Sequence, residues 1–356
     1  MKGCINLMKI IKQITLLLLI SISFLLFSSN IAIAHDHPGY SHDENIGYEN
    51  QHWMSKINGN TRLSQLSIPG THDSMSLYGG DSVQTQSMSL KTQLNSGIRY
   101  LDIRCRYINK TVFSIHHDMV FQKVMFGNVL NEAIDFLHRN PSETILMRVK
   151  QEYSSVSNSE FNATFKSYVD RYKGWFWDNK GNNMQNPTLD DIRGKIVVLY
   201  DVKELNFGLS YAYRLNIQDN YSVSTNWGLH NKWENVKNHL EQANTSPNDD
   251  EIYLNYLSAS GGSFPYFIAS GHSTPGTCAS RLPTGVITPV WKNKYPDFPR
   301  INCFMGICNI AFEGTNILTT DKINNSKYSR VGILAADFPG RGLIDSTIRL
   351  NDIYKY

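Results

Sequence analysis

The chain has 356 residues, and its hydrophobic share of 41% and charged share of 18% are those of an ordinary globular protein. Its 34 basic residues outnumber its 31 acidic residues by three, and three lysines fall within the first 12 residues. The rest of the chain is therefore balanced, which argues against a general basic field and against nucleic acid as a partner.

Residues 1–34 have the three parts of a secretory signal peptide: a basic start, an apolar run over 14–27 and the small-residue site Ala32-Ile-Ala34. We therefore expect a secreted protein whose mature chain starts near His35. An uncleaved membrane anchor is the alternative, although the apolar run is short for a span. Residues 35–50 are polar and turn-rich, and predict a flexible mature N-terminus rather than a weak metal site.

A histidine and an aspartate follow the first apolar strand of the mature chain. Pro69-Gly70 is expected to end this strand, so that His72 and Asp73 begin the next loop. In a parallel α/β protein, catalytic groups lie on such loops, and histidine can transfer a proton near neutral pH. The alternative is a structural pair in which Asp73 or Ser74 caps the next helix.

The second predicted strand, residues 98–106, places Asp102 and Arg104 on one face, because side chains alternate along a strand. Two buried opposite charges are costly unless they meet each other or a ligand, so they form either a structural ion pair or an anion site. A third strand over 112–118 ends in His116-His117, whose rings face opposite ways, so at most one of them can serve a central site.

The remaining pattern alternates strands with helices. We expect helices over 51–63, 87–94, 128–140, 159–172, 189–193, 233–243 and 343–351, and strands over 144–150, 194–201, 215–223, 252–258 and 330–337. This rhythm predicts a distorted (β/α)8 barrel over residues 51–356. Polar residues follow the strands and would converge on one mouth: His72, Asp73, Asp102, Arg104, His117, Lys150, Asp219, Tyr221 and Asp337.

Residues 271–328 are irregular and rich in Gly, Pro, Asn and Thr, so we expect a surface excursion or added subdomain there, with Trp291, Phe298 and Phe304 as its local core. Beyond Cys4 of the leader, the cysteines are Cys105, Cys278, Cys303 and Cys308. One bridge within the late group of three is plausible, and the full pairing stays open. No zinc-ligand spacing is present, and no metal is expected.

Two imidazoles, an arginine and carboxylates at one mouth suit cleavage of a phosphodiester by an internal hydroxyl. One histidine removes the hydroxyl proton, the other protonates the leaving oxygen, and Arg104 offsets the charge that develops on phosphorus. This scheme requires no metal or other cofactor.

Seven sequence blocks, in order over residues 64–350, resemble the bacterial phosphatidylinositol-specific phospholipases C. They are Ile68-Pro-Gly-Thr-His-Asp-Ser74, Gly97-Ile-Arg-Tyr-Leu-Asp-Ile-Arg104, Ile115-His-His117, Asn140-Pro-Ser-Glu-Thr-Ile145, Gln218-Asp-Asn-Tyr221, Leu254-Asn-Tyr-Leu-Ser258 and Arg330-Val-Gly332 through Asp337. The resemblance implies a distorted TIM-like barrel and a monomer that visits a membrane surface. The implied reaction is calcium-independent, and gives diacylglycerol and inositol 1,2-cyclic phosphate.

The resemblance also assigns roles to individual residues. His72 corresponds to the general base and Asp337 to its orienting carboxylate, while His117 corresponds to the general acid. The other implied roles are protonation of the leaving group for Asp73, holding the acid histidine for Asp102, phosphate binding for Arg104, inositol hydroxyl contacts for Lys150 and Asp219, and a ring on which inositol stacks for Tyr221.

The chain departs from the family pattern in two places. Tyr200-Asp-Val-Lys203 stands where many members have an inositol-binding arginine, and residues 75–95 lack the tryptophan with which many members enter the bilayer surface. The rival hypotheses are a calcium-dependent phospholipase C, a glycerophosphodiester phosphodiesterase, and a non-catalytic barrel that binds inositol or glycans.

Overall fold

Eight parallel strands form a nearly closed barrel in the computed structural model, which describes residues 34–179, 184–205, 207–248 and 250–356. The strands pair in the order β7-β6-β5-β2-β1-β15-β10-β8. The barrel is not fully closed, because β7 and β8, at the two ends of this order, are not paired with each other. Their bounds are β1 Ile68–Thr71, β2 Tyr100–Ile108, β5 Ile145–Gln151, β6 Ile196–Tyr200, β7 Leu209–Ser210, β8 Leu215–Gln218, β10 Ile252–Tyr256 and β15 Ile333–Ala336. The predicted distorted (β/α)8 barrel is confirmed.

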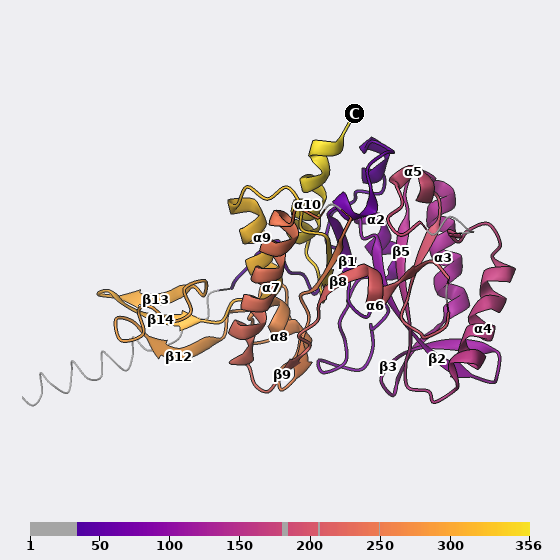
Figure 1. The fold of residues 1–356 in the computed structure, drawn as a ribbon. Coiled ribbons are helices and arrows are strands. Elements are labelled where there is room, and N and C mark those ends of the chain that lie inside the picture. The colour runs from indigo at the N-terminus through magenta and orange to yellow at the C-terminus, as the bar shows by residue number, and fades with distance from the viewer. Residues whose placement is uncertain (1–33, 180–183, 206, 249) are drawn as a thin grey trace, which may run out of the picture. The chain divides into compact units, whose positions relative to one another are not determined.

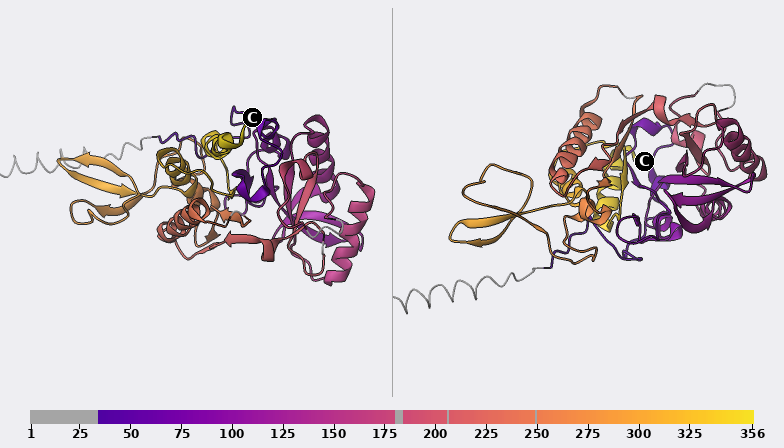
Figure 2. Two further views of the ribbon diagram at one scale, coloured as in Figure 1. Left: turned by 45° about the horizontal axis from the view of Figure 1, so that its top comes forward. Right: turned by 90° about the horizontal axis from the view of Figure 1, so that it is seen from below.

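Helices surround this barrel, as the two views of Figure 2 show. They are α2 Leu90–Asn95, α3 Phe126–Arg139, α4 Asn158–Arg171, α5 Leu189–Ile192, α6 Tyr211–Arg214, α7 Gly228–Thr245, α8 Pro265–Ser270, α9 Thr315–Asn325 and α10 Arg341–Arg349, with 3-10 turns η1 Trp53–Lys56, η2 Leu63–Gln65 and η3 Leu350–Tyr354. Among the helices that the structure describes, none combines the length and apolar composition that a membrane span requires. The predicted signal peptide falls almost wholly outside the described residues.

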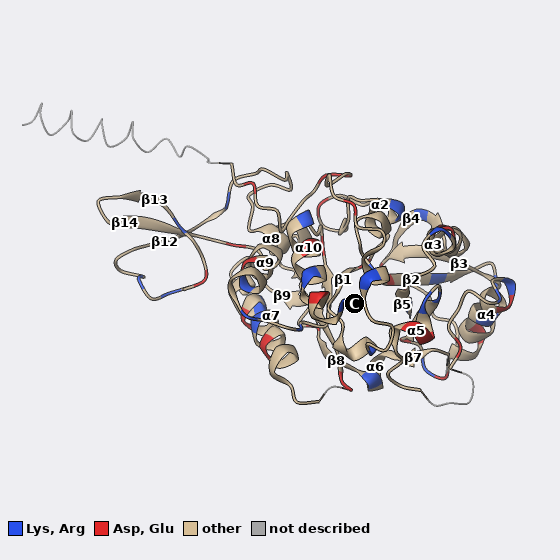
Figure 3. Cartoon of the chain, turned by 90° about the horizontal axis from the view of Figure 1, so that it is seen from above, with Lys and Arg blue, Asp and Glu red and all other residues tan. Residues whose placement is uncertain are grey.

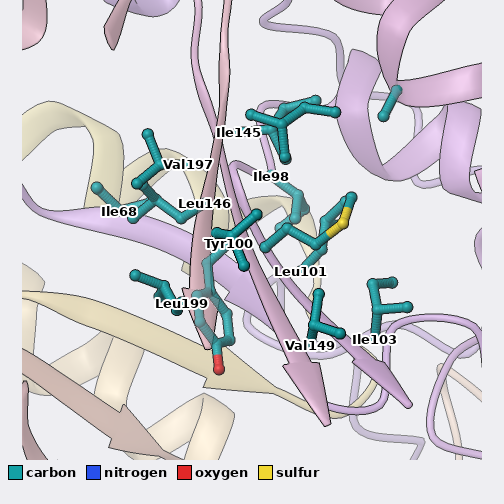
Figure 4. Packing of buried hydrophobic residues seen from close by; sticks show 14 of the residues in the cluster. Ile68, Ile98, Tyr100, Leu101, Ile103, Ile145, Leu146, Val149, Val197 and Leu199 are labelled. Atoms are coloured by element: carbon teal, nitrogen blue, oxygen red, sulfur yellow. The ribbon is translucent and has the colours of Figure 1, made fainter. Parts of the chain in front are cut away.

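The core follows from apolar strands that are buried on both faces. Figure 4 shows Ile68, Tyr100 and Leu199 on one face of the strands and Leu101 and Val149 on the other, and all five are at most 1% exposed. Such double burial is typical of parallel strands covered by helices, and it explains why these segments are nearly continuous apolar runs.

Two predicted strands have different roles in the structure. β1 continues through Pro69-Gly70 to Thr71, because Gly70 lies against the Tyr100 ring, where an added Cβ would come within 2.7 Å. The strand predicted over 112–118 is β3 (Val112–His117), which runs antiparallel to β2 and to β4 (Val120–Met125). It forms a hairpin beside the barrel, because the 3-residue connection from β2 is too short for a parallel crossover.

The irregular segment predicted over 271–328 is smaller than expected. Its regular part is a three-stranded antiparallel sheet of β12 (Pro283–Ile287), β13 (Arg300–Phe304) and β14 (Ile307–Ala311), with the order β12-β14-β13. The later part, α9, is a buried helix that packs with α7, α8 and α10 around the barrel. Cys303 and Cys308 form a disulfide, which confirms a bridge in this region, whereas Cys105 and Cys278 are free thiols.

The segment predicted as a flexible mature N-terminus is packed at its start. Tyr40 is 1% exposed, its hydroxyl donates to the carbonyl of Pro275, and its backbone pairs with Pro339. The segment is polar and turn-rich because it runs over the surface of the protein as a strap. Tyr40, whose ring is buried, anchors this strap to Pro275 and Pro339, in the last third of the chain.

Candidate active site

The carboxyl ends of the barrel strands enclose a cavity of about 410 Å³, which is within the usual range for small-molecule sites. Seven of the nine predicted site residues line it: His72, Arg104, His117, Lys150, Asp219, Tyr221 and Asp337. The other two, Asp73 and Asp102, are fully buried behind the lining. Residues up to 265 positions apart in sequence therefore meet, as the barrel rhythm predicts.

His72 follows β1 and is oriented by a carboxylate from the next strand of the barrel. Its Nδ1 lies 2.8 Å from Asp337 Oδ1, and Asp337 follows β15, the parallel neighbour of β1. A carboxylate at Nδ1 holds the proton there, so Nε2 carries the lone pair. Nε2 lies 2.7 Å from Nη2 of Arg104, which donates to it.

The loop that carries His72 has a strained backbone that is held from several sides. Asp73 has a φ of 38°, in the left-handed region that few residues other than glycine adopt. Its amide donates to Asp102, and Thr85 and Gln86 donate to the carbonyls of Asp73 and His72. Such strain is found at functional sites, where surrounding contacts fix the conformation.

Arg104 connects the two histidines. Its Nη2 contacts His72 and Asp102, and its Nη1 lies 3.4 Å from Asp73 Oδ2. Asp73 Oδ2 is in turn 3.1 Å from Nδ1 of His117, which lies at the end of β3. Burial lowers the pKa of Arg104, but the neighbouring carboxylates outweigh burial and raise it, so the guanidinium is charged at any working pH.

His117 has two neighbours at Nδ1, Asp73 and the hydroxyl of Ser76. The Ser76 Oγ is 3.0 Å away and itself donates to the carbonyl of Val83, so it accepts from the ring. The carboxylate oxygens of Asp73 make no well-oriented hydrogen bond to any described residue, so their contact with His117 is mainly electrostatic. Burial raises the pKa of Asp73, and Arg104 and His117 offset part of that rise.

Asp102 contacts arginines rather than the acid histidine, which differs from the role that the resemblance implied. Its Oδ2 lies 3.3 Å from Arg104 Nη2, and its Oδ1 lies 3.2 Å from Nη1 of Arg148 on the adjacent strand β5. Burial alone would raise the pKa of Asp102, but the two guanidinium groups outweigh it and hold the pKa well below its usual range. Asp73, not Asp102, is the carboxylate beside His117.

Arg148 is a cavity residue that the sequence analysis missed. It is paired in register with Asp102, as Lys150 is with Arg104, and it donates to Asp102, to Tyr256 and twice to Asp201. The signal was present, because Arg148 shares a strand face with Lys150 and is charged within a buried strand. Asp201, just after β6, lies in the segment where the resemblance leads one to expect an arginine. The guanidinium group next to this position belongs instead to Arg148 of β5.

Lys150, Asp219 and Tyr221 also line the cavity. The Lys150 ammonium is 3.2 Å from Glu152, a second residue that sequence reasoning missed and that also lies 3.8 Å from Arg104. The Tyr221 ring is 68% exposed and so stands at the rim. His116, by contrast, points away from the cavity and lies against Phe121, as the alternation along β3 predicts.

Within the described part of the chain, no group of three or more His, Cys, Asp or Glu side chains is arranged to hold a metal ion. The positive charge at the bottom of the cavity comes from Arg104 and Arg148 instead.

The family model for the phosphatidylinositol-specific phospholipase C X domain matches residues 60–201, which carry β1 to β6. A 1-phosphatidylinositol phosphodiesterase from Listeria monocytogenes is 32% identical over 318 residues, covering 84% of each chain. The chain belongs to the bacterial phosphatidylinositol-specific phospholipase C family. A Staphylococcus aureus protein of the same name is 33% identical over 246 residues, covering 60% of this chain and 77% of the relative.

Solved structures of this family share the fold. The phosphatidylinositol-specific phospholipase C of Listeria monocytogenes superposes with a TM-score of 0.63 at 29% identity, covering 85% of this chain and 98% of that one. A Staphylococcus aureus structure gives 0.59 at 25% identity, covering 84% and 97%. These likenesses support the barrel.

Proposed function

We propose that this chain is a phosphatidylinositol-specific phospholipase C that cleaves the lipid by attack of the inositol 2-hydroxyl on phosphorus. The products are diacylglycerol and inositol 1,2-cyclic phosphate. The observation that carries the proposal is the continuous chain of contacts from Asp337 through His72, Arg104 and Asp73 to His117. These contacts support the assignment of His72, Arg104 and His117 as base, anion-binding group and acid of one cavity.

In the proposed reaction, His72 is the base. The Asp337 carboxylate fixes the tautomer in which Nε2 is unprotonated, so Nε2 takes the proton of the 2-hydroxyl as its oxygen bonds to phosphorus. The imidazolium that forms is stabilised by Asp337. Arg104, next to Nε2, offsets the charge on the non-bridging phosphate oxygens.

His117 is the proposed acid. It protonates the glycerol oxygen as the bond between that oxygen and phosphorus breaks, which releases diacylglycerol. Asp73 and Ser76, both at Nδ1, hold the orientation of the ring. No step in this scheme needs a metal ion, because Arg104 supplies the positive charge at the phosphate.

Recognition of inositol is assigned to Lys150, Asp219 and Tyr221. Asp219 accepts and Lys150 donates hydrogen bonds to ring hydroxyls, and the exposed Tyr221 ring stacks on the face of the inositol. We also propose that the protein is secreted after cleavage near Ala34, which N-terminal sequencing of the protein from the medium would test.

The decisive experiment is phosphorus NMR of the products from phosphatidylinositol, with and without a chelator. We expect inositol 1,2-cyclic phosphate as the first phosphorus-containing product, at the same rate under both conditions. A linear inositol phosphate formed without a cyclic intermediate would contradict the mechanism. Loss of activity with the chelator would favour the calcium-dependent or glycerophosphodiesterase alternatives, and binding without turnover would favour the inositol-binding barrel.

A further inference from the structure

Large apolar side chains are exposed in an uneven pattern. Sixteen are exposed among the described residues, and six of these lie in the segment 287–307, within or between the strands of the β12–β14 sheet: Ile287, Val290, Trp291, Phe304, Met305 and Ile307. Trp291 and Phe304 were predicted to be local core, but only Phe298 of that predicted group is buried. The sheet is too thin to cover both of its faces with its own side chains, so these residues stay in solvent.

The turn between β13 and β14 exposes its apolar residues at a conformational cost. Phe304 pairs with Ile307, and the two central residues, Met305 and Gly306, have φ values of 47° and 81°. A two-residue turn with both φ positive ordinarily takes Asn or Asp before the glycine. Here a methionine that is 86% exposed occupies that position, with a disulfide from Cys303 joining the strands next to the turn. Neither hydration nor backbone preference favours methionine there, which indicates an external partner.

The charged residues of the loop between β12 and β13 are mainly basic. Residues 301–312 contain no charged side chain, so beyond Arg300 at the start of β13 the β13–β14 hairpin is tan in Figure 3. The only acidic residue between 283 and 311 is Asp297, which is neutralised by Lys237 of α7 at 2.7 Å. Lys292 and Lys294, directly after Trp291, are exposed and form no ion pair with a described residue. The two lysines lie in the β12–β13 loop, where their carbonyls accept from Arg300 at the start of β13. The small sheet therefore has an uncharged apolar tip and a basic loop, a combination that is complementary to an anionic surface.

The sheet is attached at the rim of the cavity. Trp227 follows β9 (Ser222–Val223), just beyond the rim residue Tyr221, and its ring lies 5.8 Å from Tyr295 and 5.3 Å from Phe312. Figure 1 shows the sheet projecting sideways from the α7–α8 side of the barrel. The base of the sheet therefore lies beside the rim of the cavity.

We propose that the β12–β14 sheet is a membrane-docking element, whose tip enters the surface of an anionic phospholipid bilayer while Lys292 and Lys294 contact the headgroups. The inference deepens the proposed function, since it supplies an anchor to an enzyme whose loop 75–95 has no tryptophan. A bilayer fits better than a protein partner or a second copy of this chain, because a convex turn of a few side chains offers less area than a stable protein interface buries. Lipid accepts such a wedge without shape complementarity.

The test uses the compact unit His35–Tyr356, so that the apolar leader cannot bind lipid. Its partition onto vesicles of phosphatidylcholine with phosphatidylglycerol, neither of which is the proposed substrate, is measured by sedimentation. We expect the double variant F304S/M305S to bind about 10- to 100-fold more weakly. K292E/K294E should weaken binding only when phosphatidylglycerol is present, and Ile353→Ser, a similarly exposed residue near the C-terminus, should bind as the unmodified chain does.

Three results would overturn the proposal: no binding by the unmodified chain, equal binding by F304S/M305S, or a dimer in sedimentation velocity that F304S/M305S abolishes. Unchanged thermal unfolding of the double variant shows that its fold is intact. Because the vesicles contain no phosphatidylinositol, binding is measured independently of catalysis. If the chain binds these vesicles through the β12–β14 sheet but does not cleave phosphatidylinositol, the proposed function is wrong and the membrane-docking proposal stands.

Discussion

Two arginines five residues apart, one before and one within β2, are satisfied to very different degrees. Arg99 is fully buried at the amino end of the strand, where all its donors are used, by Glu143 and by backbone carbonyls. Arg104, near the mouth, leaves its Nε without a partner among the described residues and makes only loose ionic contacts through Nη1. A buried donor without a hydrogen-bond partner destabilises the fold, so its presence at Arg104 indicates a position where a ligand interacts with the guanidinium group. The closed end of the barrel therefore stabilises the fold, and the open end carries the chemistry.

The largest expected effect at the open end is that of His117→Ala. Loss of the general acid should lower the rate of phosphatidylinositol cleavage by about 100- to 10,000-fold, with the thermal unfolding midpoint little changed. His116→Ala is the matched control, because its ring points away from the cavity, and it should keep the rate within a few-fold. Equal losses in the two variants would show that the hairpin, not the imidazole, matters.

At the closed end, Arg99→Met should destabilise the fold without altering turnover. It leaves Glu143 as an unpaired buried charge, which costs about 3–5 kcal/mol in the free energy of unfolding. Urea unfolding measures this loss, and the rate per folded molecule should be unchanged. Lys166→Met, which breaks an exposed pair with Asp170, should cost less than about 0.5 kcal/mol. If Arg99→Met does not fold, Glu143→Gln tests the same pair with its shape retained.

Arg104→Lys should have the opposite profile to Arg99→Met. Lysine keeps the charge but not the planar guanidinium that contacts His72 and Asp102, so we expect about 10- to 100-fold slower turnover with a small change in stability. Steady-state kinetics and urea unfolding of the same preparation separate the two effects. A stability loss as large as that of Arg99→Met, with turnover retained, would place Arg104 among structural residues.

The smallest effect concerns Lys232 on α7, which is fully buried near the mouth. Burial lowers its pKa to about 7, although Asp219 and Asp337 partly oppose the shift. The unfolded chain therefore binds more protons between pH 7 and the ordinary lysine pKa, and stability should rise with pH in that window, by at most about 1.4 kcal/mol per pH unit. Lys232→Met should remove this slope. If the free energies of unfolding of Lys232→Met and of the unmodified chain differ by the same amount at every pH between 7 and 9.5, the prediction is wrong.

The sequence predicted which residues meet at the cavity, because strand ends can be recognised locally. Alternation along β2 placed Asp102 and Arg104 on one face, and alternation along β3 separated His116 from His117, as the structure confirms. Arg148 was missed although it obeys the same rule. The partner of each carboxylate was less predictable, because Asp73 and Asp102 are close in space and only the strained loop decides which one lies beside His117.

Seven of the eight barrel strands, the late disulfide region and the candidate residues of the mouth were determined by the sequence itself, since each depends on local periodicity or on residue type. The two-residue strand β7 was not predicted. Tertiary structure alone decided that 35–42 is a packed strap, that β3 belongs to a hairpin, and that Trp291 and Phe304 are exposed. The physical reason is that burial depends on what covers a side chain. An apolar residue in a thin sheet has the same local pattern as one in a core, and only the fold shows that nothing lies over it.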